Sequence, residues 1–171
     1  KGSNSGYVPV GGVVIGDHVA KTFDDRVFPG GLTYSGHPLA AASISASIDI
    51  MKEEGIVENS KMIGEKILGP GLRELQDRHK VIGEVRGLGT FWALDLVKNR
   101  ETKEMIAPYG GTSQAMIDLV SACKKNGLLP FPVNFNRIHL VPPCNVSETE
   151  AKEGLGILDE ALASIGKYYE G

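Results

Sequence analysis

The pattern of apolar and polar positions changes character near residue 40. Residues 1–38 hold glycine, proline and aromatic residues around a single β-branched run, Val13-Val14-Ile15. Such a run is typical of a buried strand. From Pro38 the pattern becomes helical, because proline suits a first helical turn and Ala, Ser and Ile dominate Leu39 to Met51. The chain is therefore expected to begin with loops around one strand and to continue with a long helix.

Three more stretches have helical spacing. A helix is expected from about Glu58, and Gly69-Pro70-Gly71 predicts a break or kink before Leu72 and Leu75 resume its inward face. A helix from about Ser113 to Lys125 should stop at Asn126-Gly127. Ser147 to Glu150 form a capping box, which opens a last helix with the apolar face Ala151, Leu155, Leu158, Leu162 and Ile165.

The strands are expected between these helices. Val81–Val85 and Thr90–Val97 predict a hairpin around the turn Arg86-Gly87-Leu88-Gly89. Prolines interrupt Leu128–Val133, which indicates an edge strand or a loop. Arg137–Val141 alternates, with Ile138 and Leu140 on one face and Arg137 and His139 on the other. The fold class expected is α/β, with helices over a small, mainly antiparallel sheet.

Composition narrows the class of protein. With 171 residues, 42% hydrophobic and 23% charged, the chain has the size and character of one ordinary globular domain. The net charge of −3 argues against nucleic acid or an anionic membrane as partner. No apolar run approaches the roughly 20 residues that a membrane span needs. The two cysteines, Cys123 and Cys144, form no disulfide framework, so a cytoplasmic location is expected.

Candidate chemistry concentrates in two stretches. The four histidines are far apart in the sequence, so no metal site is expected, and a Cys144–His139 nucleophile pair is disfavoured. The opening KGSNSGYVPVGGV joins a lysine to a glycine-rich turn. Phe28–Pro38 offers hydroxyls and glycines at a helix entry, which together can hold an anion such as phosphate. Lysine forms Schiff bases with carbonyl compounds, including pyridoxal 5′-phosphate (PLP).

These stretches carry a family resemblance. Lys1-Gly2 through Tyr7, Pro9, Gly11 and Gly12 match one motif, and Gly31 to Pro38 match G-x-T-Y-S-G/A-H-P at every position. Val85–Gly89 and Pro142-Pro143 match two further motifs. The chain resembles the class III aminotransferases, or ω-transaminases, which are fold-type I PLP enzymes. The resemblance implies a PLP-dependent transferase that moves an amino group from an amine or ω-amino acid to a 2-oxo acid such as pyruvate.

The resemblance also implies roles for individual residues. Lys1 would carry PLP as an internal aldimine and then move a proton as the catalytic base. Leu32 and Thr33 would bind the cofactor, with Thr33 reaching the partner subunit's site, so that the active unit is a homodimer. Tyr7 would line the substrate pocket, although packing beneath its loop is an equal alternative. Arg86 is expected to hold the hairpin to its neighbours rather than to contact substrate.

One departure from the family concerns the substrate carboxylate. Several members place an arginine four residues before the second proline of the Pro-Pro element, and His139 occupies that position here. Arg137 lies two residues earlier on the same strand face, and it could substitute if its side chain reaches over. Both residues are therefore candidates for substrate binding, and the donor and acceptor stay open.

The other departure is length, since family members have a large cofactor domain before the lysine. Residues 1–40 are expected to be the C-terminal tail of that large domain, and residues 41–171 the small C-terminal α/β domain. The N-terminal portion of the enzyme would then be missing, and this chain alone is expected to be inactive. Two alternatives stay open: an aminomutase, racemase or decarboxylase of the same fold, and a non-catalytic interaction module.

Overall fold

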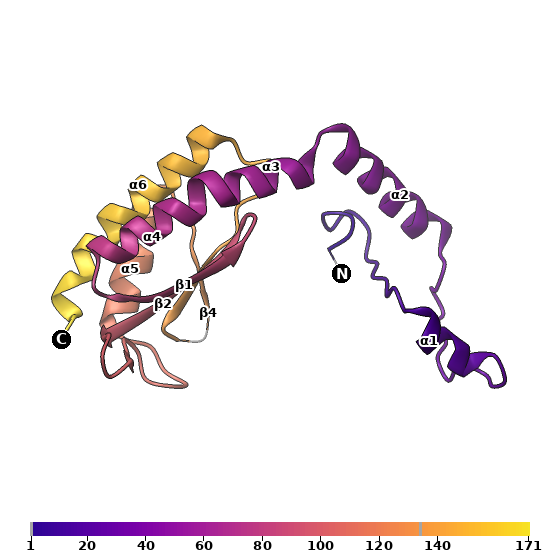
Figure 1. The fold of residues 1–171 in the computed structure, drawn as a ribbon, viewed down its shortest axis with the longest axis horizontal. Helices are drawn as coiled ribbons and strands as arrows, with labels where there is room; N and C mark the ends of the chain where they lie inside the picture. The colour runs from indigo at the N-terminus through magenta and orange to yellow at the C-terminus, as the bar shows by residue number, and fades with distance from the viewer. Residues whose placement is uncertain (1, 134) are drawn as a thin grey trace. The chain divides into compact units, whose positions relative to one another are not determined.

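Helices cover one face of a small sheet in the second of two compact units, which runs from Ile56 to Gly171 (Figure 1). The structure is a computed structural model, and it describes residues 2–133 and 135–171. The first unit ends at Gly55. The predicted boundary between residues 40 and 41 lies inside helix α2 (Pro38–Glu53), and its assignment to the domains of a larger protein stays a prediction.

The sheet of the second unit is antiparallel throughout the described residues. Its order is β1-β2-β5-β4, with β3 paired to the end of β2. The strands are β1 (Ile82–Leu88), β2 (Phe91–Asn99), β3 (Glu104–Met105), β4 (Phe131–Val133) and β5 (Arg137–Leu140). Strand β4 lies at an edge, where a proline such as Pro132 removes no bond from a central ladder. The predicted small antiparallel sheet and the predicted edge segment are both confirmed.

The β1–β2 hairpin is confirmed, but its turn is shorter than predicted. Strand β1 continues through Arg86 and ends at Leu88, which pairs with Phe91. Only Gly89 and Thr90 therefore connect the strands, and Gly89 has a φ of +55°, which favours glycine. The prediction that Arg86 lies in the turn is wrong, because cross-strand pairing continues past it.

Four helices pack against this sheet and against one another. Segments α3 (Ile56–Ile63), η2 (Gly64–Leu68) and α4 (Gly69–Arg78) follow each other directly, and α5 (Gln114–Lys125) contacts α6 (Glu148–Ile165). Segment η2 is π-helical, and a short 3-10 turn, η3 (Gly166–Tyr168), ends the chain's regular structure. No helix among the described residues has both the length and the apolar character that crossing a membrane requires.

The predicted break at Gly69-Pro70-Gly71 does not occur. The helical path widens into the π turn of η2 and continues as α4, with Pro70 in the first turn. A proline there lacks only an amide hydrogen that the start of the helix would leave unused. Leu72 and Leu75 are buried on the inward face, as predicted.

The core lies between the helices and the inner face of the sheet. Trp92, Leu94 and Leu96 alternate inward from β2, and Ile138 joins them from β5. The helices contribute a larger set of buried residues, which includes Ile63, Leu72, Leu75, Leu119, Cys123, Leu158, Leu162 and Ile165. The predicted face of the last helix is confirmed, and Cys123 is packed in the core. Phe91, at the start of β2, points to the other face and is 54% exposed.

Local capping sets the ends of α5 and α6. The Ser147 hydroxyl accepts from the Glu150 amide at 3.2 Å, and the Glu150 carboxylate accepts from the Ser147 amide at 2.9 Å. This confirms the capping box. The Ser113 hydroxyl caps α5 by accepting from the Met116 amide, and Gly127, at a φ of +92°, ends the helix as predicted.

Acid should weaken one contact between α4 and α6. Asp159 accepts from His79 at 2.5 Å and from Arg78 at 2.6 Å. The hydrogen bond from His79, with the charge of Arg78, holds the pKa of Asp159 below its usual value. A lowered folded-state pKa means that this contribution is present above the unfolded pKa of about 4 and is lost as the pH falls through the folded value. We expect the difference in melting temperature between the wild type and Asp159→Asn at about pH 5 to shrink as the pH falls below about 4. Melting curves across this pH range test the prediction, and a difference that persists at low pH would contradict it.

In the first unit, helix α2 is confirmed but the predicted strand is not. The regular elements are α1 (Asp17–Ala20), η1 (Lys21–Phe23) and α2 (Pro38–Glu53). Residues 13–15 belong to no strand among the described residues, and Val13 is 88% exposed. A strand needs a neighbour to accept and donate its backbone hydrogen bonds, and none lies beside this segment within the described unit. The prediction of a buried strand is therefore wrong for this chain.

Candidate functional site

Residues of the lysine motif, which begins at Lys1, and of the threonine motif, Gly31–Pro38, line one groove of the first unit. The groove has a volume of about 680 Å³, and it lies between residues 8–11 on one side and the turn before α2 on the other. Its lining from the second motif includes Leu32, Tyr34, Ser35, Gly36 and His37. The fold therefore brings the lysine motif and the threonine motif to a common site. Lys1 itself lies outside the described residues.

The loop after Lys1 is held by a buried amide. Asn4 is 2% exposed, and its Nδ2 donates to the Val8 carbonyl and to the Ser43 hydroxyl, both at 2.8 Å. Its Oδ1 accepts from the Gly6 amide at 3.2 Å. Tyr7 is 87% exposed, so the structure does not pack it beneath its loop. Sequence reasoning missed Asn4, although a polar residue within a glycine-rich turn is a signal for such side-chain bonding.

The second motif forms turns that end in the cap of α2. The Ser35 amide donates to the Leu32 carbonyl at 2.9 Å, and the His37 amide donates to the Tyr34 carbonyl at 3.2 Å. His37 Nδ1 accepts from the Leu39 amide at 3.2 Å and so caps the helix. The helix N-terminus, which was a predicted anion site, is thus occupied by the chain's own side chain.

Thr33 lies in the exposed part of the same turns. Its side chain is exposed, and Gly36 closes the turn with a φ of +68°. A free hydroxyl is the kind of donor that a phosphate oxygen accepts from. The residues present therefore fit the phosphate end of a cofactor through Thr33 rather than through the end of α2.

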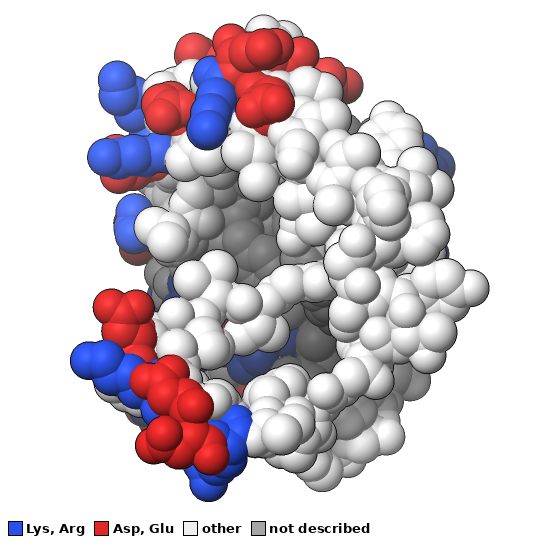
Figure 2. Space-filling view, turned by 90° about the vertical axis from the view of Figure 1, so that its right-hand side faces the viewer, with Lys and Arg blue, Asp and Glu red and all other residues white. Residues whose placement is uncertain are grey.

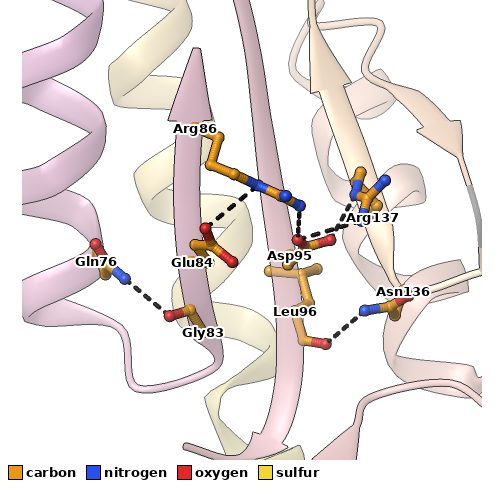
Figure 3. A network of polar contacts seen from close by, with 8 residues as sticks. All are labelled: Gln76, Gly83, Glu84, Arg86, Asp95, Leu96, Asn136 and Arg137. Carbon is orange, nitrogen blue, oxygen red and sulfur yellow. Dashed lines mark hydrogen bonds and ion pairs between the residues drawn. The ribbon is translucent and has the colours of Figure 1, made fainter. Parts of the chain in front are cut away.

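A charged network occupies the open face of the sheet in the second unit (Figure 3). Arg137 Nε lies 2.5 Å from Asp95 Oδ1, and Arg86 also pairs with Asp95. Arg86 Nε also lies 3.4 Å from the Glu84 carboxylate, within the same sheet. The network supports a structural role for Arg86. It also raises the pKa of Arg137, mainly through the hydrogen bond to Asp95, so the guanidinium stays charged.

His139 lies on the same face, next to this network but outside it. Its ring centroid is 5.3 Å from that of Phe91 on β2, and Phe131 of β4 pairs with it across the strands. The described candidates thus form two groups. Tyr7, Leu32 and Thr33 belong to the first unit, whereas Arg137 and His139 belong to the second.

Asp95 was also missed by sequence reasoning. An acidic residue in the middle of the apolar run Thr90–Val97 was the available signal, because strand alternation alone places it on the face opposite Leu94 and Leu96. Its pairing with Arg137 could not be read from the sequence, since the register of β2 against β5 decides it.

The exposed surface of the first unit is uncharged around the two motifs. Residues 2–16 and 27–48 contain no Lys, Arg, Asp or Glu. Figure 2 shows charged side chains gathered in groups, with a broad uncharged surface beside them. Large apolar side chains are exposed here, among them Val13, Val14, Val27, Leu32 and Tyr34. Contiguous exposed apolar surface of this kind is typical of regions that another protein surface covers.

Comparison with known proteins identifies the family. The pattern of the family described as aminotransferase class-III matches residues 1–162. The chain is 35% identical over 170 residues to the putrescine–pyruvate aminotransferase of Pseudomonas aeruginosa, covering 96% of this chain and 36% of that protein. It is 33% identical over 137 residues to the ethanolamine-phosphate phospho-lyase homolog 1 of Caenorhabditis elegans, covering 79% of this chain and 28% of that protein.

A solved structure gives the same result. The taurine:2-oxoglutarate aminotransferase from Bifidobacterium kashiwanohense, in complex with PLP and glutamate, matches with a TM-score of 0.88 and 34% identity. The match covers 98% of this chain and 37% of that one. The chain therefore spans about a third of the length of the relatives it matches. The predicted α/β fold class of fold-type I transferases is confirmed, and the chain belongs to the class III aminotransferase family.

Proposed function

We propose that this chain takes part in PLP-dependent transamination, from an amine or ω-amino acid donor to a 2-oxo acid such as pyruvate. The observation that carries the proposal is the groove in which the lysine motif and the threonine motif meet. The named substrates of the relatives support it, since they include putrescine, pyruvate, taurine and 2-oxoglutarate. All of these relatives are longer proteins, so the activity belongs to the whole enzyme.

PLP, when bound, supplies an electrophilic carbonyl and an electron sink. Thr33, with Leu32 beside it, would hold the phosphate end, because the Thr33 hydroxyl is exposed in a turn that borders the groove. The Lys1 amine would act as nucleophile and then carry a proton at Nζ. A lysine suits both tasks when burial lowers its pKa toward neutrality.

The candidate substrate-binding residues belong to both units. Tyr7 is exposed and free to contact the donor, which its alternative position beneath the loop would not allow. Arg137 is paired with Asp95, so binding a substrate carboxylate would require breaking that pair. His139 lies outside the pair and is half-buried beside the ring of Phe91. We therefore favour His139 over Arg137 as the residue nearest the acceptor carboxylate.

The proposed active unit is a homodimer in which Thr33 reaches the partner subunit's cofactor. The uncharged, apolar surface around Thr33 supports this arrangement, because exposing it to water in the final assembly would be unfavourable.

A different PLP reaction is the second candidate. The phospho-lyase homolog of Caenorhabditis elegans is about as similar to this chain as the transaminases are, so elimination is a specific alternative to amino transfer. A racemase, decarboxylase or aminomutase would use the same lysine and phosphate motifs.

Borohydride reduction of the whole enzyme tests the proposal, because this chain alone is expected to be inactive. We expect a pyridoxyl group on the peptide that begins at Lys1, found by mass analysis, and no such group in Lys1→Arg. Incubation with an amine donor and pyruvate should then yield alanine, whereas a lyase would release ammonia or phosphate without alanine. An unmodified Lys1 after addition of PLP would show that the assignment of the lysine is wrong and would favour a non-catalytic module.

A further inference from the structure

We propose that Asn4 is a positioning residue that holds the segment carrying Lys1 against helix α2. The inference rests on the proposed function, since it concerns the lysine of that reaction. The Asn4 side chain forms a hydrogen-bonded clamp with the Val8 carbonyl, the Gly6 amide and the Ser43 hydroxyl. These three bonds join the lysine loop to itself and to α2.

The clamp needs an amide side chain. Asn4 Nδ2 has two hydrogens and finds two acceptors, both at 2.8 Å, while Oδ1 accepts from a backbone amide. An aspartate could keep only the last of these bonds and would place a charge beside a carbonyl oxygen. Because Asn4 is 2% exposed, a donor or acceptor that lost its partner here could not form a hydrogen bond to water instead.

The backbone around Asn4 would not keep its shape without such a clamp. Gly2, Ser5 and Gly6 have φ values of +77°, +54° and +81°. Ser5 is the costly one, because a residue with a Cβ rarely adopts this conformation. The Tyr7 amide also donates to the Asn4 carbonyl at 3.1 Å, which closes the turn.

Ser43 connects this loop to the second motif. It lies in α2, the helix that begins directly after Gly31–His37, and its hydroxyl also donates to the Ala40 carbonyl at 2.8 Å. Asn4 is three residues from Lys1, so the extended length of the chain keeps their Cα atoms within about 11 Å. The clamp therefore fixes Asn4, three residues after Lys1, to the helix that follows Thr33.

The sharpest test changes Ser43, since it removes one acceptor and leaves the loop sequence intact. In Ser43→Ala holoenzyme we expect amide exchange at Gly6 and Tyr7 to be about fivefold faster, the effect of losing one hydrogen bond of about 1 kcal/mol. The pH midpoint of the absorbance change of bound PLP should also move by about half a unit, because the Lys1 amine is less well placed. Asn4→Ala should increase the exchange rate and shift the midpoint by more than Ser43→Ala does.

Two variants serve as controls. Ser45→Ala makes the same substitution in the same helix at an exposed position, and it should leave exchange and titration at wild-type values. Ser43→Thr keeps the hydroxyl and should also leave exchange and titration at wild-type values. Wild-type exchange in Ser43→Ala would show that the clamp does not hold the loop. A wild-type titration midpoint despite faster exchange would limit Asn4 to a structural role and overturn its positioning role. If the wild-type holoenzyme shows no PLP band at all, the proposed function fails, and the role of Asn4 in it fails for that separate reason.

Discussion

Replacing Gly64 by alanine is expected to lower the free energy of unfolding by about 2–3 kcal/mol. A Cβ at this position would lie 2.2 Å from the Gly89 carbonyl oxygen and 2.6 Å from the Gly89 Cα. These are backbone atoms of the hairpin turn, which cannot rotate away as a side chain can. The π-helical segment and the hairpin would have to separate.

Other contacts oppose that separation. The Trp92 indole donates to the same Gly89 carbonyl at 2.7 Å, and the Thr90 amide donates to the Ser60 hydroxyl at 3.2 Å. Alanine favours a helix over glycine by only about 1 kcal/mol, so the clash outweighs the gain in propensity. The melting temperature should fall by about 5–10 °C.

Gly156→Ala is the matched control. Gly156 lies within α6, and no atom comes within 4 Å of a Cβ built there. This substitution should therefore stabilise the protein by about 0.5–1 kcal/mol. Thermal or urea unfolding of both variants tests whether the two substitutions change stability in opposite directions. Equal stability of Gly64→Ala and the wild type would mean that the helix and the hairpin are not in close contact in solution.

Asp95→Asn is expected to cost about 2 kcal/mol of stability while keeping the shape of the side chain. Asp95 is the shared partner of Arg86 and Arg137, and only 16% of its side chain is exposed (Figure 3). Asparagine keeps one oxygen acceptor but loses the other, and it leaves two guanidinium groups beside each other without a negative charge between them. Urea unfolding measures the loss.

A double-mutant cycle separates the Asp95–Arg137 pair from other effects. Combining Asp95→Asn with Arg137→Gln should give a coupling energy of about 1–2 kcal/mol. Glu84→Gln, in an exposed pair with Arg86, should change stability by less than about 0.5 kcal/mol. If Asp95→Asn costs as much without Arg137 as with it, the pair does not account for the effect.

The pairing of Arg137 also bears on substrate choice. Arg137 and His139 lie on one strand face, and the sequence offers both to a carboxylate. Arg137 is paired with the Asp95 carboxylate, so a substrate carboxylate would have to compete with Asp95 for the guanidinium. We therefore expect His139→Ala to affect the KM for the 2-oxo acid more than Arg137→Gln does, once the loss in stability is taken into account.

The elements that the sequence predicted well are those with local causes. The capping box at Ser147 needs only Glu150, three residues on, and the stop after α5 needs only the freedom of Gly127. The apolar face of α6 follows from the helical period, and the alternation of β5 follows from the pleat. The four family motifs are likewise local strings, which is why the family could be identified from the sequence.

Long-range neighbours decided the features that the sequence left open or misjudged. Val13–Ile15 has the composition of a strand but lacks a partner among the described residues, and Gly69-Pro70-Gly71 stays helical because the preceding turn widens. The length of the hairpin turn depended on pairing between Leu88 and Phe91.

The candidate site divides in the same way. By itself the sequence determined the family, and through it the roles expected of Lys1, Leu32, Thr33 and Tyr7, because each belongs to a short motif. Only the tertiary structure joined Asn4 to Ser43, 39 residues away, and Asp95 to Arg137, 42 residues away. Side-chain bonds over such separations depend on how helices and strands pack, and no local spacing encodes that packing.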